Sequence, residues 1–341
     1  MPEVTQRAAR SEPRSVVGWQ GLTFELPADW NVTGFSMDRD EGYLKVDSPG
    51  TMFVQVKWSN RSRRRPRSLF EALYAAWKRR KGAGEHVPQE PPDLRATLEE
   101  FLKQTRKQSR KQRAPFECKV KPETVEHGGE RVAHNFSWTG GGHAQGKMWF
   151  CRTCGRSVIA QVVGQGKDNV AGIASALFSS IRDHSADGWN TWALYDLVAA
   201  VPESFRLRAQ KLMSGYLRLE FDRRGGERLT IERWGLANVT RRKFTVAEWL
   251  QTMCEGSRHG ARTSAASVHG HEAALGAGRL RSLAAWAGAL RDAMGSRSVA
   301  SVYDGCVWEC TENNKLYAVQ LWRTRKSEGL LDEVVARCEC H

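Results

Sequence analysis

Two cysteines, Cys151 and Cys154, stand three positions apart with Gly155 directly after them. Two thiolates at this spacing on a tight turn can bind one tetrahedral zinc ion, but a closed site needs about four ligands. The sequence holds no second Cys-x-x-Cys pair. The remaining ligands would have to come from Cys118 or from the C-terminal group Cys338, Cys340 and His341.

Three interpretations of this motif stay open. Ordinary reduced thiols are the favoured one, because a partner pair is missing. Zinc ligands come second. No cofactor is expected from the favoured interpretation, and zinc is the one cofactor that the motif leaves open. A redox pair comes third, because such a pair normally opens a helix whose dipole lowers the thiol pKa, whereas this pair lies between two predicted strands.

Positive charge gathers between residues 57 and 113, where 17 Lys and Arg face 6 Asp and Glu. The excess of 11 is most of the chain's formal net charge of +14. Such a segment attracts polyanions or acidic protein surfaces, although a charge run is more often a solvated face. The candidate polyanion-binding residues are Arg61, Arg63, Arg64, Arg65, Arg67, Lys107, Arg110 and Lys111.

No catalytic residue is predicted. Gly141, Gly146 and Lys147 have the spacing of a phosphate-binding loop, but Met148 stands where Ser or Thr would bind magnesium. A strand is also expected next, where such a loop requires a helix. The pair His269 and His271 is better explained as part of a repeated turn than as a metal site.

The elements that carry these motifs occur twice, in the same order. Each copy shows a Pro-x-x-aromatic step, a Gly-Tyr-Leu strand, a strand ending at Trp, and a helix start of the form Ser/Thr-x-x-Glu, which is a capping box. These patterns begin at Pro27, Gly42, Val54 and Ser68 in the first copy, and at Pro202, Gly215, Leu229 and Thr245 in the second. We expect Trp58 with Trp234, and Trp149 with Trp308, to fill equivalent core positions.

The two copies also end alike, with Ile181–His184 matching Cys338–His341. Together with the Pro-x-x-Trp30 and Pro-x-x-Phe205 entries and the Ser68 and Thr245 helix starts, this order resembles the PsbP-like fold. That fold is an α-β-α sandwich, also found in a Ran-binding nuclear import factor and in bacterial lipoproteins. The resemblance implies an α+β protein of two tandem α-β-α sandwich domains with mainly antiparallel sheets.

The predicted organisation has three parts. Residues 1–15 form a disordered tail, and residues 16–186 form the first domain, with a basic insertion at 82–115. Residues 187–341 form the second domain, with an extra helix near 283–294. A length of 341 residues suits two domains of roughly 100–200 residues each.

The predicted function is that of a non-catalytic binding or scaffold protein with a basic surface on its first domain. A protein partner is expected, since members of the resembling fold mostly bind or assemble. Binding of nucleic acid or another polyanion through residues 57–113 is one alternative, and an enzyme with a site between the two domains is another. The absence of an apolar leader and of an apolar run long enough to span a membrane predicts a cytoplasmic protein.

Overall fold

The computed structural model describes residues 13–38, 41–60, 91–111, 113–254, 261–279 and 300–340. The chain divides into two compact units. The first holds the chain before Gly18 and Leu22–His184, and the second holds Gly18–Gly21 and Ser185–His341. Most of the predicted tail, the basic run 61–67, the helix start at Ser68, the helix near 283–294 and His341 lie outside the described residues.

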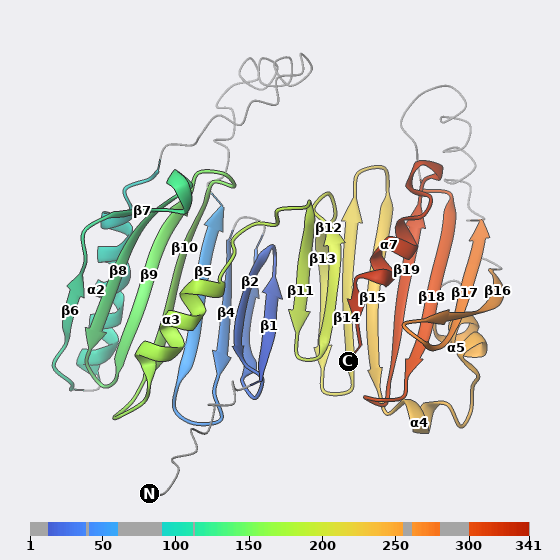
Figure 1. The fold of residues 1–341 in the computed structure, drawn as a ribbon, viewed down its shortest axis with the longest axis horizontal. Coiled ribbons are helices and arrows are strands. Elements are labelled where there is room, and N and C mark those ends of the chain that lie inside the picture. The colour runs from blue at the N-terminus through green and yellow to red at the C-terminus, as the bar shows by residue number, and fades with distance from the viewer. Residues whose placement is uncertain are drawn as a thin grey trace, which may run out of the picture. The chain divides into compact units, whose positions relative to one another are not determined.

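The first unit is built around one antiparallel sheet (Figure 1). Its strands lie in the order β3-β4-β5-β10-β9-β8-β6, and β7 also pairs with β8. The elements, after the hairpin β1 (Arg14–Trp19) and β2 (Leu22–Pro27), are β3 (Asn31–Met37), β4 (Glu41–Asp47), β5 (Phe53–Asn60), α2 (Leu94–Lys111), β6 (Glu117–Val120), β7 (Thr124–Glu126), the 3-10 turn η1 (His127–Gly129), β8 (Arg131–Thr139), β9 (His143–Cys151), β10 (Arg156–Gly164) and α3 (Val170–Ser180).

The second unit repeats this plan with a sheet in the order β13-β14-β15-β19-β18-β17-β16. Its elements are β11 (Trp189–Leu194), β12 (Leu197–Pro202), β13 (Arg206–Met213), β14 (Tyr216–Arg223), β15 (Glu227–Gly235), α4 (Ala237–Thr240), α5 (Val246–Met253), β16 (Arg262–Val268), β17 (His271–Arg279), β18 (Val302–Cys310), β19 (Lys315–Arg323), the 3-10 turn η3 (Arg325–Ser327), α7 (Leu330–Ala336) and β20 (Cys338–Glu339). The strand β12 pairs with both β11 and β20.

The two large sheets share their strand order element by element, as the sequence repeat predicts. They even share an irregularity. The pairing of β3 with β4 shifts register between Val32 and Gly34, and the pairing of β13 with β14 shifts between Leu207 and Ala209, one residue after each strand begins. A β-bulge at the same place in both units increases the local twist of the first strand pair in the same way.

Helices cover each sheet at matching places. In the first unit α2 lies against β8 and β9, and in the second α5 lies against β16, β17 and β18. The predicted helix at Thr245 is confirmed: its hydroxyl accepts from the N–H of Glu248 at 3.2 Å, and the Glu248 carboxylate accepts from the N–H of Thr245 at 2.7 Å. In the first unit the side chain of Asp93 opens α2 by accepting from the N–H of Ala96 at 2.9 Å.

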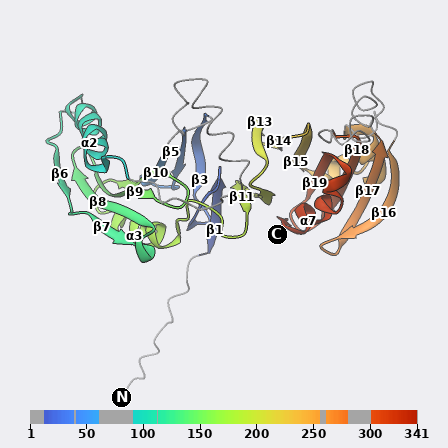
Figure 2. The same ribbon diagram turned by 90° about the horizontal axis from the view of Figure 1, so that it is seen from above.

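The helix α2 therefore takes the place that corresponds to α5. Leu94, Leu98 and Leu102 recur every four residues and point into a core with Phe136 and Met148 of the sheet. Much of the predicted basic insertion at 82–115 is thus a covering helix with a buried apolar stripe. Figure 2 shows α2 and α3 on opposite sides of this sheet.

The predicted fold class is wrong. Of the described residues, 53% are in strands and 20% in helices, so the protein is nearer to an all-β protein than to an α+β sandwich. The two large sheets are antiparallel and are formed largely by long strands joined through hairpins. The closing helices span only 11 residues in α3 and 7 in α7, too few to form a helical layer over either sheet.

The strand registers correct one detail of the repeat. Trp149 lies opposite Val158, and Trp308 lies opposite Tyr317, and both Trp side chains are fully buried at corresponding places. Trp58 is also buried, but Trp234 is only half-buried and packs on Trp249 of α5. The Trp58–Trp234 equivalence is therefore wrong, because the two tryptophans face different environments.

The packing of α2 can be tested with Leu98→Ala. Leu98 is fully buried, and removing such a side chain costs about 2–5 kcal/mol of unfolding free energy. Urea denaturation monitored by circular dichroism measures this loss. The control is Val125→Ala on β7, where the side chain is 63% exposed and the expected change is within about 0.5 kcal/mol. A loss at Leu98 no larger than that at Val125 would contradict a core role for α2.

Candidate functional site

The predicted metal ligands do not all come together. Cys151 ends β9, and Cys154 lies on the turn between β9 and β10. Cys118 is an exposed residue of β6, the edge strand, and it faces Trp138 of β8 rather than the turn. Cys338 and Cys340 belong to the second unit. Cys118, Cys338 and Cys340, which the sequence suggested as further zinc ligands, therefore do not join Cys151 and Cys154 within the first unit.

The turn itself is shaped to hold two sulfur atoms. Its N–H at Gly155 donates to the carbonyl of Cys151 at 2.8 Å, and Gly155 has a φ of 70°, which favours glycine. The thiol of Cys154 points to the segment after α3, where it donates to the backbone carbonyl of Asp183 at 3.9 Å.

The two thiols are electrostatically unequal. The neighbouring side chain of Cys154 lowers the pKa of Cys151 to about 6, against the effect of burial. The side chain of Cys151 in turn raises the pKa of Cys154, and burial raises it further. Cys151 is therefore the more acidic of the two thiols.

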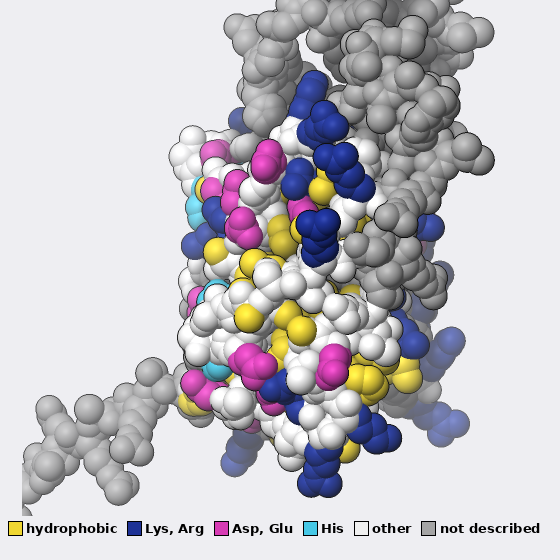
Figure 3. All heavy atoms as spheres, turned by 90° about the vertical axis from the view of Figure 1, so that its right-hand side faces the viewer, with side chains coloured by type: hydrophobic (Ala, Val, Ile, Leu, Met, Phe, Trp, Pro, Cys, Tyr) yellow, Lys and Arg dark blue, Asp and Glu magenta, His cyan; other side chains and the backbone are white. Residues whose placement is uncertain are grey.

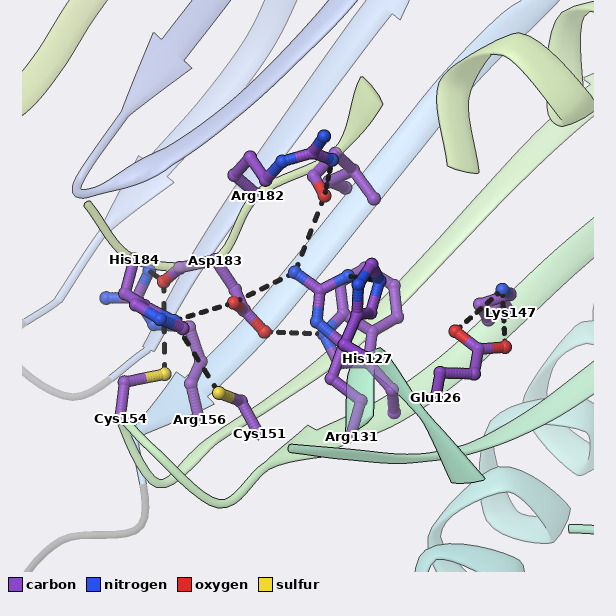
Figure 4. A network of polar contacts seen from close by, with 12 residues as sticks. Glu126, His127, Arg131, Lys147, Cys151, Cys154, Arg156, Arg182, Asp183 and His184 are labelled. Atoms are coloured by element: carbon purple, nitrogen blue, oxygen red, sulfur yellow. Dashed lines mark hydrogen bonds and ion pairs between the residues drawn. The ribbon is translucent and has the colours of Figure 1, made fainter. Parts of the chain in front are cut away.

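A buried carboxylate, Asp183, lies beside this turn (Figure 4). Its Oδ1 accepts from the guanidinium of Arg131 at 3.0 Å, and its Oδ2 accepts from the indole N–H of Trp149 at 2.7 Å. Its backbone carbonyl accepts from Arg156 at 3.1 Å. Burial raises the pKa of Asp183, but the charge of Arg131 and these hydrogen bonds outweigh burial and hold the pKa below its usual value.

The next residue, His184, brings an imidazole to the same place. Its Nδ1 lies 2.9 Å from Oδ1 of Asp183 and 3.6 Å from the sulfur of Cys151. Both contacts are made by one ring nitrogen. A Cys-His-Asp relay needs the two different nitrogens of the ring, one for the nucleophile and one for the carboxylate. The geometry is therefore not that of a catalytic triad, and it suits a set of metal ligands better.

Ligand atoms from Cys151, Cys154, Asp183 and His184 all lie within 4.8 Å of one another. We call these four residues the Cys-His corner. Sequence reasoning missed Asp183 and His184, because both are distant from the Cys-x-x-Cys motif along the chain. The available signal was the shared ending of the two copies, where Asp183 and His184 match Cys340 and His341, all four being residue types that bind metals.

The second unit has a related corner. Ligand atoms of His271, Cys310 and Cys340 lie within 4.8 Å of one another. Ala133 pairs with Trp149 in the first unit, and Ala273 pairs with Trp308 in the second. Arg131 and His271 each lie two residues before these alanines, so they hold equivalent positions in the two sheets. In the second unit His271 therefore takes the position of Arg131, and Cys340 takes the position of Asp183.

The described candidate polyanion-binding residues lie on α2. Lys107, Arg110 and Lys111 are exposed and, with Lys103 and Arg106, recur at spacings of three and four, so that the five form one face of the helix. We call this face the basic stripe. Lys103 pairs with Glu100 at 3.6 Å, whereas the other four have no acidic partner within the described part of the chain. The candidates Arg61, Arg63, Arg64, Arg65 and Arg67 lie outside the described residues.

A hollow of about 270 Å³ lies between α2 and the sheet. Phe101 and Trp138 supply aromatic walls, and Lys57 lies at its margin with its ammonium 5.9 Å from the ring centroid of Phe101. Five amide side chains line it: Gln55, Gln104, Gln108, Gln161 and Gln165. The hollow therefore combines aromatic surface with groups that both donate and accept hydrogen bonds.

No protein-family model and no curated protein matches the chain. Among solved structures, the solution structure of cyanobacterial PsbP from Synechocystis sp. PCC 6803 is similar to it, with 12% sequence identity and a TM-score of 0.31. The match covers 54% of this chain and 99% of that one. The likeness is a distant one in fold, and it identifies no specific protein. None of the described helices is long and apolar enough to cross a membrane.

The role of Arg131 can be tested with Arg131→Met. This change leaves Asp183 buried without its cation, which costs about 3–5 kcal/mol of unfolding free energy. The matched control is Arg95→Met, because Arg95 pairs with Glu99 at 2.8 Å on the exposed side of α2. An exposed pair contributes at most about 1 kcal/mol. Equal losses for the two variants, measured by urea denaturation, would contradict a special role for the buried pair.

Proposed function

We propose that this chain is a non-catalytic nucleic-acid-binding protein that uses the basic stripe of its first unit. The observation that carries the proposal is the row of four neighbouring cations, Arg106, Lys107, Arg110 and Lys111, which have no acidic partner among the described residues. From Phe101 to Phe116 the sequence contains no Asp or Glu. Cations that are not neutralised within the protein are the groups that attract a phosphate backbone.

The arrangement of these cations supports binding along a line. Arg106 and Arg110, and likewise Lys107 and Lys111, are four residues apart, so the cations form two adjacent rows along one side of α2 with steps of about 6 Å. A helix face that only meets solvent usually carries charges of both signs. The start of α2 has this pattern, with Arg95 paired to Glu99 and Lys103 paired to Glu100. The second half carries one sign only, which favours a polyanionic partner.

The hollow beside α2 favours a single strand over a duplex. Single-stranded nucleic acids present unstacked bases, which proteins bind through aromatic surface and through hydrogen bonds to the base edges. The hollow offers both kinds of contact, from Phe101 and from the exposed amides of Gln104 and Gln108. It is also smaller than the roughly 300–1,000 Å³ of a typical ligand pocket, so it suits one flat ring.

The side of the second unit seen in Figure 3 carries no comparable surface for binding a polyanion. There, acidic side chains lie among the basic ones, and apolar side chains lie between them. Charges of both signs at close spacing cancel at a distance of about one Debye length, roughly 8–10 Å in physiological salt. The basic stripe of the first unit is therefore the better candidate surface.

The test is the salt dependence of binding to a fluorescently labelled single-stranded oligonucleotide, followed by anisotropy. Each phosphate contact contributes about 0.7 to the slope of log affinity against log salt for a single strand. The triple variant Lys107→Gln, Arg110→Gln, Lys111→Gln should therefore lower the slope by about 2 and weaken binding at low salt.

The matched control removes three cations from the second unit, with Arg206→Gln, Arg208→Gln and Lys211→Gln on β13. These residues are exposed, so the control changes the net charge equally without touching α2. We expect the control to retain the slope of the unaltered protein. The proposal fails if the unaltered protein does not bind at low salt, or if both triple variants lose affinity equally.

A further inference from the structure

We propose that the Cys-His corner of the first unit binds a zinc ion through the sulfurs of Cys151 and Cys154, an imidazole nitrogen of His184 and a carboxylate oxygen of Asp183. This site is separate from the basic stripe, and the proposal does not depend on nucleic-acid binding. Four donors complete a closed tetrahedral site, the arrangement that structural zinc sites adopt.

The spacing of the donors supports this assignment. In a tetrahedral site with a zinc–sulfur bond of about 2.3 Å and a zinc–nitrogen bond of about 2.05 Å, sulfur and nitrogen lie about 3.6 Å apart. The observed separation between the sulfur of Cys151 and Nδ1 of His184 is 3.6 Å. The four ligand atoms converge from two segments, the β9–β10 turn and the segment after α3, so that a central ion would join them.

The surroundings are those of an oriented ligand set. The guanidinium of Arg156 donates to the backbone carbonyl of Asp183 at 3.1 Å. Arg131 and the indole of Trp149 hold the carboxylate of Asp183 from behind. Outer hydrogen bonds of this kind fix the direction of metal ligands and strengthen binding.

The charges also balance. Zinc carries two positive charges, and two thiolates with one carboxylate carry three negative ones, which leaves one negative charge for Arg131 to neutralise. Binding releases to solvent the protons still on the two thiols, and His184 binds as a neutral imidazole through its unprotonated nitrogen, because metal ligands must be deprotonated. The contact between His184 and Asp183, now 2.9 Å, then becomes a separation between two ligands of one ion.

A redox role fits the corner less well. A Cys-x-x-Cys redox pair exchanges between thiols and a disulfide and gains its low pKa from a helix N-terminus. Here the pair lies on a turn between two strands, and Cys151 is fully buried. The neighbouring imidazole and carboxylate have no part in a disulfide, whereas all four side chains have a part in a metal site.

The experiment measures metal by elemental analysis on the full-length protein purified without added metal. We expect about one equivalent of zinc that is lost in Cys154→Ser and in His184→Gln, because each removes a ligand from a four-ligand site. Cys118→Ser is the matched control, since that thiol is exposed on β6 and lies opposite Trp138, at the other end of β8 from the residue that pairs with Cys151. A further variant, Cys310→Ser, tests the related corner of the second unit and should leave this equivalent in place.

Reconstitution with cobalt gives a readout that does not depend on folding of the variants. Cobalt bound by thiolates shows an intense near-ultraviolet charge-transfer absorption, which the unaltered chain should develop and zinc should abolish. Zinc below about a tenth of an equivalent with no such absorption would overturn the proposal. Zinc retained in both Cys154→Ser and His184→Gln, or a native mass showing a Cys151–Cys154 disulfide, would overturn it as well.

Discussion

The first unit depends on the burial of one carboxylate. An ionised Asp in a protein interior is tolerated only when it is paired and hydrogen-bonded, because the desolvation cost is otherwise several kcal/mol. Asp183 meets this requirement through Arg131 of β8 and Trp149 of β9, and its main chain meets Arg156 of β10. Three neighbouring strands thus fix the segment that follows α3, and His184 reaches the turn of Cys151 and Cys154 as a consequence.

Strand geometry connects this corner with the opposite face of the sheet. Successive side chains of a strand point to opposite faces. In β9, Met148 and Phe150 pack in the core beneath α2, while Trp149 and Cys151 point toward Asp183 and His184. An ion that holds the β9–β10 turn would therefore also steady the strands on which the basic stripe rests. The corner would in that case support the proposed binding surface on α2 without taking part in it.

Many single strands and helices could be predicted from local patterns, but the fold class could not, and of the site only Cys151 and Cys154 could be predicted. The capping box at Thr245 and the alternation of Val54, Val56 and Trp58 depend only on near neighbours, and the structure has the helix and the strand there. The covering role of α2 was hidden, because Leu94, Leu98 and Leu102 lie within a strongly charged stretch. The corner is a long-range contact: about thirty residues separate Cys151 from Asp183 and His184, and only the packing of the chain after α3 brings them together.

The most direct measurement is an anomalous difference map, collected on either side of the zinc absorption edge, from crystals of the full-length protein grown without added metal. We expect one peak, present only above the edge, at bonding distance from the sulfurs of Cys151 and Cys154, the imidazole of His184 and the carboxylate of Asp183. The absence of a peak in this corner, or continuous density joining the two sulfurs, would contradict it.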